Sequence, residues 1–98
     1  MEKRTPHCRL PEIKALVLSG HVRATTSSLA GAAGLGLCFQ DMVDVVLALS
    51  VADFHKSMTT HADHTIWQDV YRPHTKVGPV YLKLTVLAGV LIVSFKEL

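Results

Sequence analysis

The C-terminal stretch of residues 79–97 constrains the fold more than any other part of the chain, because two runs in it alternate apolar and polar side chains. In VYLKLTVL every second residue from Val80 onward is apolar, and in VLIVSFKE the apolar positions again recur at every second residue. A period of two is typical of strands that bury one face. We therefore predict strands over residues 79–87 and 90–97, joined by a hairpin that turns at Ala88-Gly89.

The length of this turn decides which residues of the hairpin face each other. A loop of two or four residues pairs Tyr81 with Lys96 on one face, with their Cβ atoms about 5 Å apart. On the other face the same register sets apolar residues against each other, namely Val86 against Leu91, Leu84 against Val93, and Leu82 against Phe95. An odd loop would break this pairing, and a slip of one residue would turn every apolar side chain to the wrong face.

Before residue 53 the apolar residues follow a helical period instead. LPEIKALVLSG predicts a helix within residues 10–20, in which Pro11 suits the first helical position and Gly20 suits the residue just past the end. HVRAT, residues 21–25, predicts a short edge strand that follows this helix.

Two more helices are predicted in the first half of the chain. TTSSLAGAAGLG predicts a short helix that is capped by Thr26 or Ser27 and ends at Gly34. FQDMVDVVLALS, residues 39–50, places its apolar residues on one side and predicts an amphipathic helix.

The order of these elements indicates the fold class. Two further strands are predicted over residues 54–60 and 65–72, so helices come first and an antiparallel meander follows. This order is typical of an α+β fold, with N-terminal helices packed on one face of a mainly antiparallel sheet formed by the C-terminal half. We expect one domain over residues 1–98, since a chain of this length supports a single modest core.

Composition excludes some classes of protein. Ten Lys and Arg against eight Asp and Glu give a net charge of +2, which is too small to indicate nucleic-acid binding alone, although the whole excess lies after residue 53. The longest apolar run, VLAGVLIV, is far shorter than the roughly 20 residues of a membrane helix. MEKRTPHCRL has no apolar segment that would direct export. We therefore expect a soluble cytoplasmic protein without membrane contact, whose Cys8 and Cys38 are small buried thiols.

Three histidines, His55, His61 and His64, lie close together in the sequence. Their spacing matches no known zinc motif and no cysteine is nearby, so exposed turn residues are the simpler interpretation and no metal site is predicted. A pair of histidines on a basic face would also be able to cleave RNA, one taking the proton of the 2′-OH and one protonating the leaving oxygen. We keep this as an alternative.

A phenol beside an ammonium group is a sharper candidate site. The sheet face away from the helices carries Tyr81, Lys83 and Lys96, and a Tyr–Lys pair on an open face can bind phosphate and stabilise negative charge. Lys56 and Gln68 belong to the preceding hairpin. An odd loop there, such as His61-Ala62-Asp63, would make them face each other, whereas an even loop would separate them onto opposite faces.

Five strings of residues resemble the motility quorum-sensing regulator (MqsR) family of toxins: MEKRTPH, KSMTT, DHTIWQDVYRP, VYLKLTV and LIVSFKE. The resemblance runs from end to end of the chain. It implies a RelE-like α+β fold and a type II toxin, a sequence-specific endoribonuclease that cuts mRNA at GCU-type sites without the ribosome and needs no cofactor. It also implies an MqsA-type antitoxin partner, a zinc-containing helix-turn-helix protein. The toxin would then contact DNA only indirectly, through this antitoxin.

The resemblance also implies a site. The family's catalytic residues match Lys56, Gln68, Tyr81 and Lys96, the four side chains that strand register can place on one face. The sequence departs from the family in SSLAGAAGLGLCFQDMVDVVLAL, which is unusually rich in Ala and Gly, and in HTKVGP. These departures affect helix packing and the rim of the site more than the type of reaction.

The resulting hypothesis is RNA cleavage without a metal ion, in which a ribose 2′-OH attacks the adjacent phosphate. Lys56 and Lys96 would neutralise the phosphate, and one of them, its pKa lowered by the other, would serve as general base. Tyr81 would orient the phosphate or donate a proton, and Gln68 would position the nucleotide. Two further residues are expected to contact backbone phosphates of single-stranded RNA: Arg72 and Lys83. A catalytically inactive chain that only binds and regulates its antitoxin is the alternative from another class.

Overall fold

The computed structural model describes residues 1–98 and contains three α-helices, a 3₁₀ turn and seven strands. In chain order the elements are β1 (Glu2–Lys3), α1 (Leu10–Leu18), β2 (Val22–Ala24), α2 (Thr26–Gly34), α3 (Phe39–Ala48), η1 (Val51–Asp53), β3 (Phe54–Thr59), β4 (Trp67–Tyr71), β5 (His74–Thr75), β6 (Gly78–Val86) and β7 (Val90–Glu97). The three predicted helices, the edge strand and the four longer strands are all present. The two-residue strands β1 and β5 were not predicted.

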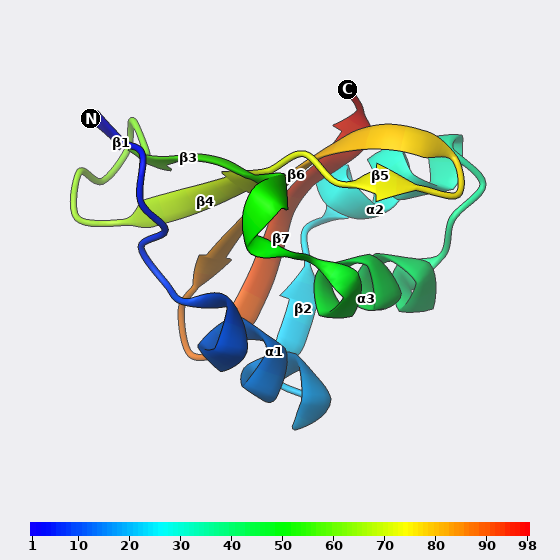
Figure 1. The fold of residues 1–98 in the computed structure, drawn as a ribbon, viewed down its shortest axis with the longest axis horizontal. Helices are drawn as coiled ribbons and strands as arrows, with labels where there is room; N and C mark the ends of the chain where they lie inside the picture. Colours follow the sequence, from blue (N-terminus) through cyan, green and yellow to red (C-terminus); the bar gives the residue numbers. More distant parts are fainter.

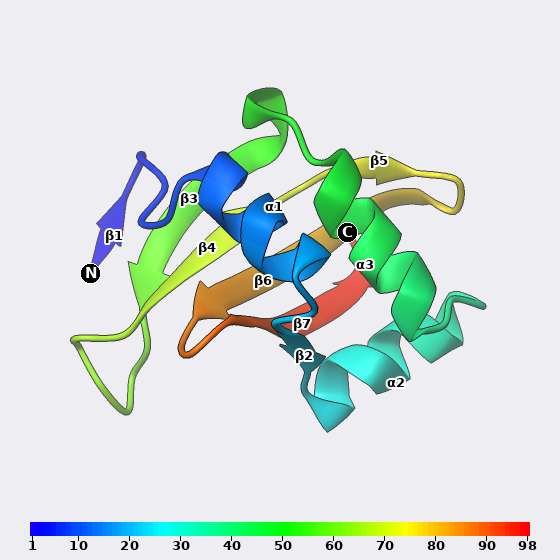
Figure 2. The same ribbon diagram turned by 90° about the horizontal axis from the view of Figure 1, so that it is seen from below.

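The strands form one sheet in the order β1-β3-β4-β6-β7-β2, with β5 paired to β6 outside this path. Every pair is antiparallel except β2 with β7. Helices α1 and α3 lie across one face of the sheet, and α2 lies beside β7 and β2 (Figures 1 and 2). The opposite face carries no helix. The predicted α+β class is confirmed.

The core lies between the helices and the sheet. Leu10, Ile13 and Val17 recur along one side of α1 and are buried, and Met42 and Val46 do the same in α3. The sheet contributes the apolar side chains that alternate toward the helices, which include Tyr71, Val80, Leu82, Leu84, Ile92 and Phe95. No single helix is long and apolar enough to cross a membrane, and α2 and α3 reach that length only when taken together across a 91° bend.

Helix ends follow the sequence signals with one correction. Pro11 lies in the first turn of α1, and Gly20, just past its end, has φ +83°. The cap of α2 is Thr25, whose hydroxyl accepts the amide of Ser28 at 3.1 Å, and not Thr26 or Ser27. The shift has a tertiary cause, because the same hydroxyl donates to the carbonyl of Val93 at 3.0 Å and thereby ties the helix start to β7.

Helix α2 packs unusually close to β7, and its small residues make this possible. A Cβ atom added at Gly31 would overlap the carbonyl oxygen of Phe95 and lie 3.1 Å from its carbonyl carbon. Ala32 and Ser28 are buried in the same contact, where the Ser28 hydroxyl donates to the carbonyl of Ile92 at 3.1 Å. The Ala- and Gly-rich composition of this segment therefore allows a close helix–strand contact.

The predicted register of the β6–β7 hairpin is correct at one end and wrong at the other. Tyr81 faces Lys96 and Leu82 faces Phe95, as predicted. Nearer the turn, Leu84 faces Ile92 and not Val93. Likewise, Val86 faces Val90 and not Leu91.

The cause is a three-residue loop, residues 87–89, followed by a bulge. Ala88 and Gly89 have φ +50° and +114°, and the loop amide of Leu87 bonds the Gly89 carbonyl at 2.8 Å. The odd loop shifts the register by one residue, as expected of such a loop. The pairing shifts back between Lys83 and Leu84, where Val93 is the extra residue of a β-bulge.

Candidate active site on the open face of the sheet

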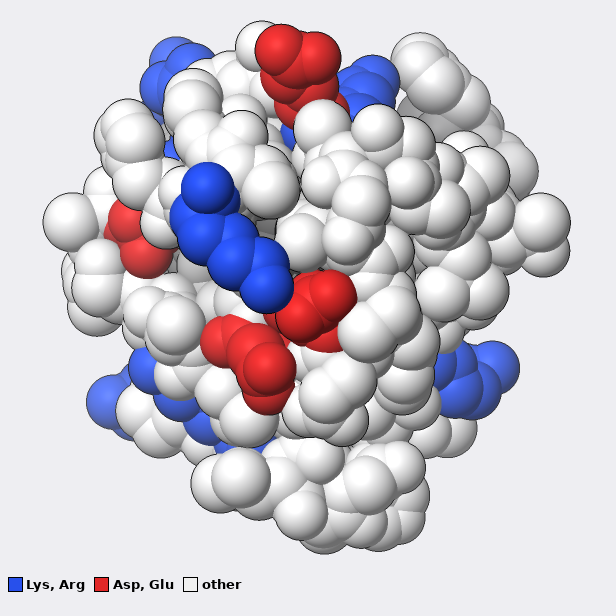
Figure 3. Space-filling model, turned by 90° about the vertical axis from the view of Figure 1, so that its right-hand side faces the viewer, with Lys and Arg blue, Asp and Glu red and all other residues white.

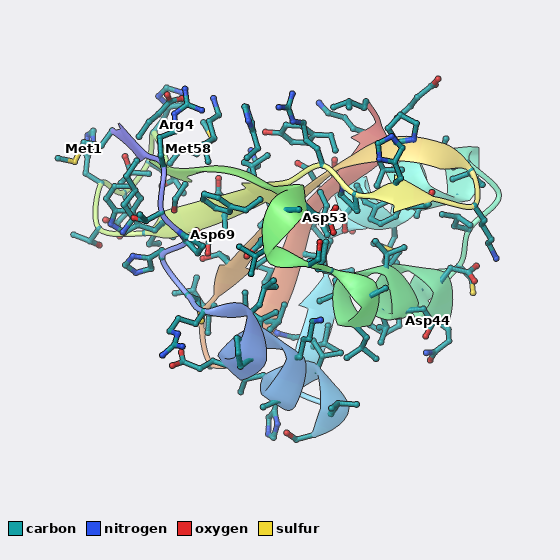
Figure 4. All side chains as sticks on the ribbon, in the orientation of Figure 1. Met1, Arg4, Asp44, Asp53, Met58 and Asp69 are labelled. Atoms are coloured by element: carbon teal, nitrogen blue, oxygen red, sulfur yellow. The ribbon has the colours of Figure 1, made fainter.

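The sheet face opposite the helices gathers polar and basic side chains from four neighbouring strands. In Figure 4, Arg4 and Met58 lie above the sheet while Asp69 lies below it, as expected from the alternation of side chains along strands. The strand registers place these further residues on the same face as Met58: Lys56, Gln68, Val70, Tyr81, Lys83, Ser94 and Lys96. All four predicted catalytic residues therefore share one face.

Tyr81 and Lys96 form the best-defined contact of this face. They are direct partners of β6 and β7, and the Lys96 Nζ atom lies 5.1 Å from the centroid of the Tyr81 ring. At this distance the face of the ring attracts the cation. The pairing leaves the phenol oxygen and the ammonium group together at an exposed part of the sheet.

Lys56 lies on β3 and contacts a residue from the start of the chain. Its Nζ atom lies 2.7 Å from Oε1 of Glu2, and the pKa of that carboxyl is lowered, first by this hydrogen bond and then by the charge of Lys56. Glu2 reaches it because β1 pairs with β3, setting Glu2 opposite Met58. Sequence reasoning missed Glu2, since a two-residue strand has no period from which its pairing could be predicted.

Gln68 lies on the same face as Lys56. The two residues do not face each other, although the predicted three-residue loop would have paired them. Gln68 is opposite Met58 and Lys56 is opposite Val70, so the two are diagonal neighbours. The loop is odd, as needed to keep them on one face, but it has five residues, 61–65.

Local hydrogen bonds of the loop explain its length. The hydroxyl of Thr60 accepts the amide of Asp63 at 2.9 Å, and the carboxylate of Asp63 accepts the amide of Thr65 at 2.8 Å. The amide of Thr60 donates to the carbonyl of Ile66 at 3.1 Å and closes the loop. Side-chain turns of this kind compete with a tighter hairpin.

Lys83 occupies the middle of the open face. It lies on β6 opposite Val70 of β4 and Ser94 of β7, and it is half-buried. Its pKa is lowered by burial, and further by the positive charges of Lys96 and Lys56. The mutual repulsion of these lysines makes the face attractive to an anion.

Two more basic groups border the face. Arg72 follows β4 and is exposed, while its backbone amide donates to the carbonyl of Asp53 at 2.8 Å. His55 lies at the irregularity between Phe54 and Lys56, and its pKa is lowered by burial and then by Arg72, Lys56 and Arg4. Sequence reasoning missed Arg4, whose approach to this face depends on the path of residues 1–9.

That N-terminal segment is held in place by a buried carboxylate. Asp69 points toward the helix side of the sheet and is 2% exposed. It accepts the amides of His7 and Cys8, each at 3.1 Å, and the hydroxyl of Ser57 at 2.5 Å. Trp67 is covered by the same segment, since the His7 ring stacks on it at a centroid distance of 5.6 Å. Its indole is thus used in packing.

The other two histidines do not join the site. His61 and His64 are exposed in the loop of residues 61–65, whereas His55 lies on β3. No three His, Cys, Asp or Glu side chains converge in an arrangement that could hold a metal ion.

The open face is shallow. One cleft, of about 320 Å³, lies between α3 and the β5 segment and is lined by Asp41, Asp44 and Lys76, among others. The other, of about 340 Å³, lies beside the start of α1. Figure 3 shows the end of the molecule where α2, α3 and β5 meet: a basic side chain lies beside acidic ones near the middle, and other charged side chains lie around the edge of an otherwise uncharged surface. Neither cleft includes any of the six predicted site residues. A shallow basic face suits an extended strand better than a small molecule.

Two comparisons with known proteins bear on this arrangement. A family model described as "Motility quorum-sensing regulator, toxin of MqsA" matches residues 5–97. The mRNA interferase toxin MqsR of Escherichia coli (strain K12) is 62% identical over 97 residues, which cover 99% of each chain.

Proposed function

The chain belongs to the family of motility quorum-sensing regulators, toxins of MqsA, and from this premise we propose that it is an mRNA interferase, the endoribonuclease toxin of a type II toxin–antitoxin pair. One observation carries the proposal. Tyr81 and Lys96 are paired on the open face of the sheet, and Lys56 and Lys83 lie on the same face. This cluster of cations and a phenol is suited to a phosphodiester.

The substrate of the proposed reaction is single-stranded mRNA, cut at GCU-type sites without the ribosome. Bases of an unpaired strand can be splayed out and read at their edges, and the shallow face admits such a strand. Arg72 and Lys83 bring the RNA backbone to the site through phosphate contacts. Gln68, with an amide that both donates and accepts, positions the nucleotide next to the reacting phosphate.

The proposed chemistry is attack of a ribose 2′-OH on the adjacent phosphorus. A P–O2′ bond forms, the P–O5′ bond breaks, and the products are a 2′,3′-cyclic phosphate and a 5′-OH. Lys56 and Lys96 stabilise the negative charge of the pentacoordinate state, which is the largest single effect in many such sites. A basic side chain of the open face takes the proton of the 2′-OH, and Tyr81 orients the phosphate or gives a proton to the leaving oxygen. In this scheme side chains carry every proton, so it requires no metal ion or cofactor.

The proposed partner is an MqsA-type antitoxin, a zinc-containing helix-turn-helix protein, in accord with the description of the family as toxins of MqsA. Contact with DNA would be indirect, through this antitoxin. Because its substrate is mRNA, the toxin is proposed to act in the cytoplasm as a single domain.

A second candidate for the catalytic groups is favoured by one observation. His55 lies next to Lys56, and its lowered pKa keeps the imidazole neutral and able to accept a proton at neutral pH. His55 would then act as general base on the same substrate.

Cleavage of an end-labelled RNA with GCU sites tests the proposal. The wild type is assayed in EDTA beside alanine variants at Lys56, Gln68, Tyr81 and Lys96, and product ends are identified by their mobility before and after phosphatase treatment. We expect cutting in EDTA, cyclic phosphate ends, and a loss of at least about 100-fold when Tyr81 or Lys96 is removed. Lys76, an exposed lysine paired with Asp41 at 3.4 Å, provides a matched control that should keep full activity as alanine.

Four results would contradict parts of this proposal. Dependence on a divalent cation would refute the metal-free reaction, and full activity without both Tyr81 and Lys96 would refute the site. Loss of cutting in the His55→Ala variant, with the lysine variants active, would favour the histidine mechanism. A wild type that binds its antitoxin but cuts no RNA would favour the inactive regulator.

A further inference from the structure

The three lysines of the open face differ in what their ammonium groups contact. Lys56 has a carboxylate partner in Glu2 at 2.7 Å, and Lys96 lies over the Tyr81 ring at 5.1 Å. Each of these two ammonium groups thus has a partner that attracts its charge. The ammonium group of Lys83 makes no hydrogen bond and no ion pair, so no partner attracts its charge in the same way.

The position of Lys83 further favours its neutral form. It lies on the central strand β6 and is half-buried, with uncharged Val70 and Ser94 opposite it on the two neighbouring strands. The charged groups that bear on it are cations, Lys56 from β3 and Lys96 from β7, while the carboxylate of neighbouring Asp69 points to the other side of the sheet. Burial lowers the pKa of Lys83 most, and the two lysines lower it further.

Its neighbours also place it next to the proposed reaction. Tyr81 lies two residues away on the same strand and face, at about 7 Å along the strand. Lys56 and Lys96 flank it on opposite sides, from β3 and from β7. A phosphate held between these two lysines would lie over Lys83.

We propose that Lys83 is a catalytic residue, the general base that takes the proton of the attacking 2′-OH. This role rests on the proposed ribonuclease function and goes beyond the backbone contact given to Lys83 above. The lone pair of the neutral amine binds the 2′-OH proton as the P–O2′ bond forms. The P–O5′ bond then breaks and the leaving oxygen takes a proton from Tyr81 or Lys96. The Lys83 ammonium then gives its proton to water, and water returns a proton to the group that served as acid.

Single-turnover cleavage by a Lys83→Arg variant tests the role, because arginine has a similar reach but does not lose its proton in proteins and so cannot act as a base. We expect the cleavage rate to fall about 100- to 10,000-fold, as for loss of a general base, while RNA affinity changes only a few-fold. The wild-type rate should rise with pH and level off below the ordinary pKa of lysine. Lys76→Arg is the control and should leave rate and pH profile unchanged.

Small primary amines added to a Lys83→Ala variant provide a second test, with circular dichroism confirming its fold. We expect part of the activity to return in proportion to the concentration of free amine base. An unchanged rate in Lys83→Arg, or a folded Lys83→Ala protein that no amine rescues, would overturn the inference while leaving the ribonuclease function intact. A wild type that cuts no RNA would instead overturn the proposed function and this inference with it.

Discussion

Two glycines of helix α2 should respond in opposite directions to the same substitution. Gly31 lies against the backbone of β7, whereas Gly34, in the same helix, has nothing within 4 Å of the position where a Cβ atom would be. Alanine favours helix over glycine by about 1 kcal/mol in a helix interior and by less at its end. Only at Gly31 is this gain opposed by a collision.

The size of the collision follows from the contact. A Cβ atom at Gly31 would lie 3.1 Å from the carbonyl carbon of Phe95 and would overlap its oxygen, so α2 would have to withdraw by about 1 Å. That movement would stretch the hydrogen bonds from the side chains of Thr25 and Ser28 to the carbonyls of β7. Overpacking of this kind costs about 1–3 kcal/mol or more, and here the contacting atoms are backbone, so we expect a net loss of about 2 kcal/mol.

Thermal and urea unfolding followed by circular dichroism measure both variants. For a chain of this length a loss of 2 kcal/mol lowers the melting temperature by about 8–16 °C. We expect that fall for Gly31→Ala, and an unchanged or slightly raised melting temperature for Gly34→Ala. A Gly31→Ala protein as stable as the wild type would refute the close contact between α2 and β7.

The remaining predictions concern buried and half-buried groups. Asp69→Asn should lower the free energy of unfolding, measured in urea, by about 2–3 kcal/mol, because the buried side chain loses charge-assisted hydrogen bonds. The control Asp44→Asn, at an exposed position of α3, should change this free energy by less than about 0.5 kcal/mol. Equal effects of the two substitutions would contradict this account. Tyr71→Phe should leave that free energy unchanged or raise it by up to about 1 kcal/mol, since the buried Tyr71 hydroxyl has no hydrogen-bond partner, and a clear loss would mean that it has one. Iodoacetamide at pH 8 should modify Cys38 before Cys8, because burial and a nearby glutamate raise the pKa of the Cys8 thiol to about 11. Peptide mass spectrometry measures the two rates of modification, and equal rates would contradict this prediction.

Local periodicity was sufficient to predict the longer elements, because each buries one side of a regular repeat. It predicted α1, α3 and the four longer strands. Helix α2 was predicted from its capping hydroxyls, and the edge strand at Val22–Ala24 from its place between two helices. The two-residue strands β1 and β5 are too short to show a period. The bulge at Val93 could not be predicted either, because it compensates for a turn of three residues. The sequence Ala-Gly does not by itself determine the length of that turn.

The candidate site could be predicted as a set of residues but not in its geometry. The pair Tyr81–Lys96 lies on the part of the hairpin where the predicted register holds. The pair Lys56–Gln68 needed only an odd loop to share a face, yet its offset depends on hydrogen bonds within the loop of residues 61–65. Glu2 was not foreseen, because no local pattern connects the start of the chain to β3.

The bulge at Val93 has a consequence for how this protein can diverge. The three-residue turn moves β7 by one position, and Val93 moves it back before the strand reaches Lys96. The two irregularities shift the register of β7 by one residue in opposite directions and so cancel. A change in turn length, matched by loss of the extra residue, would therefore leave Tyr81 opposite Lys96. The tip of the hairpin is thus free to vary across evolution while the reactive end keeps its alignment.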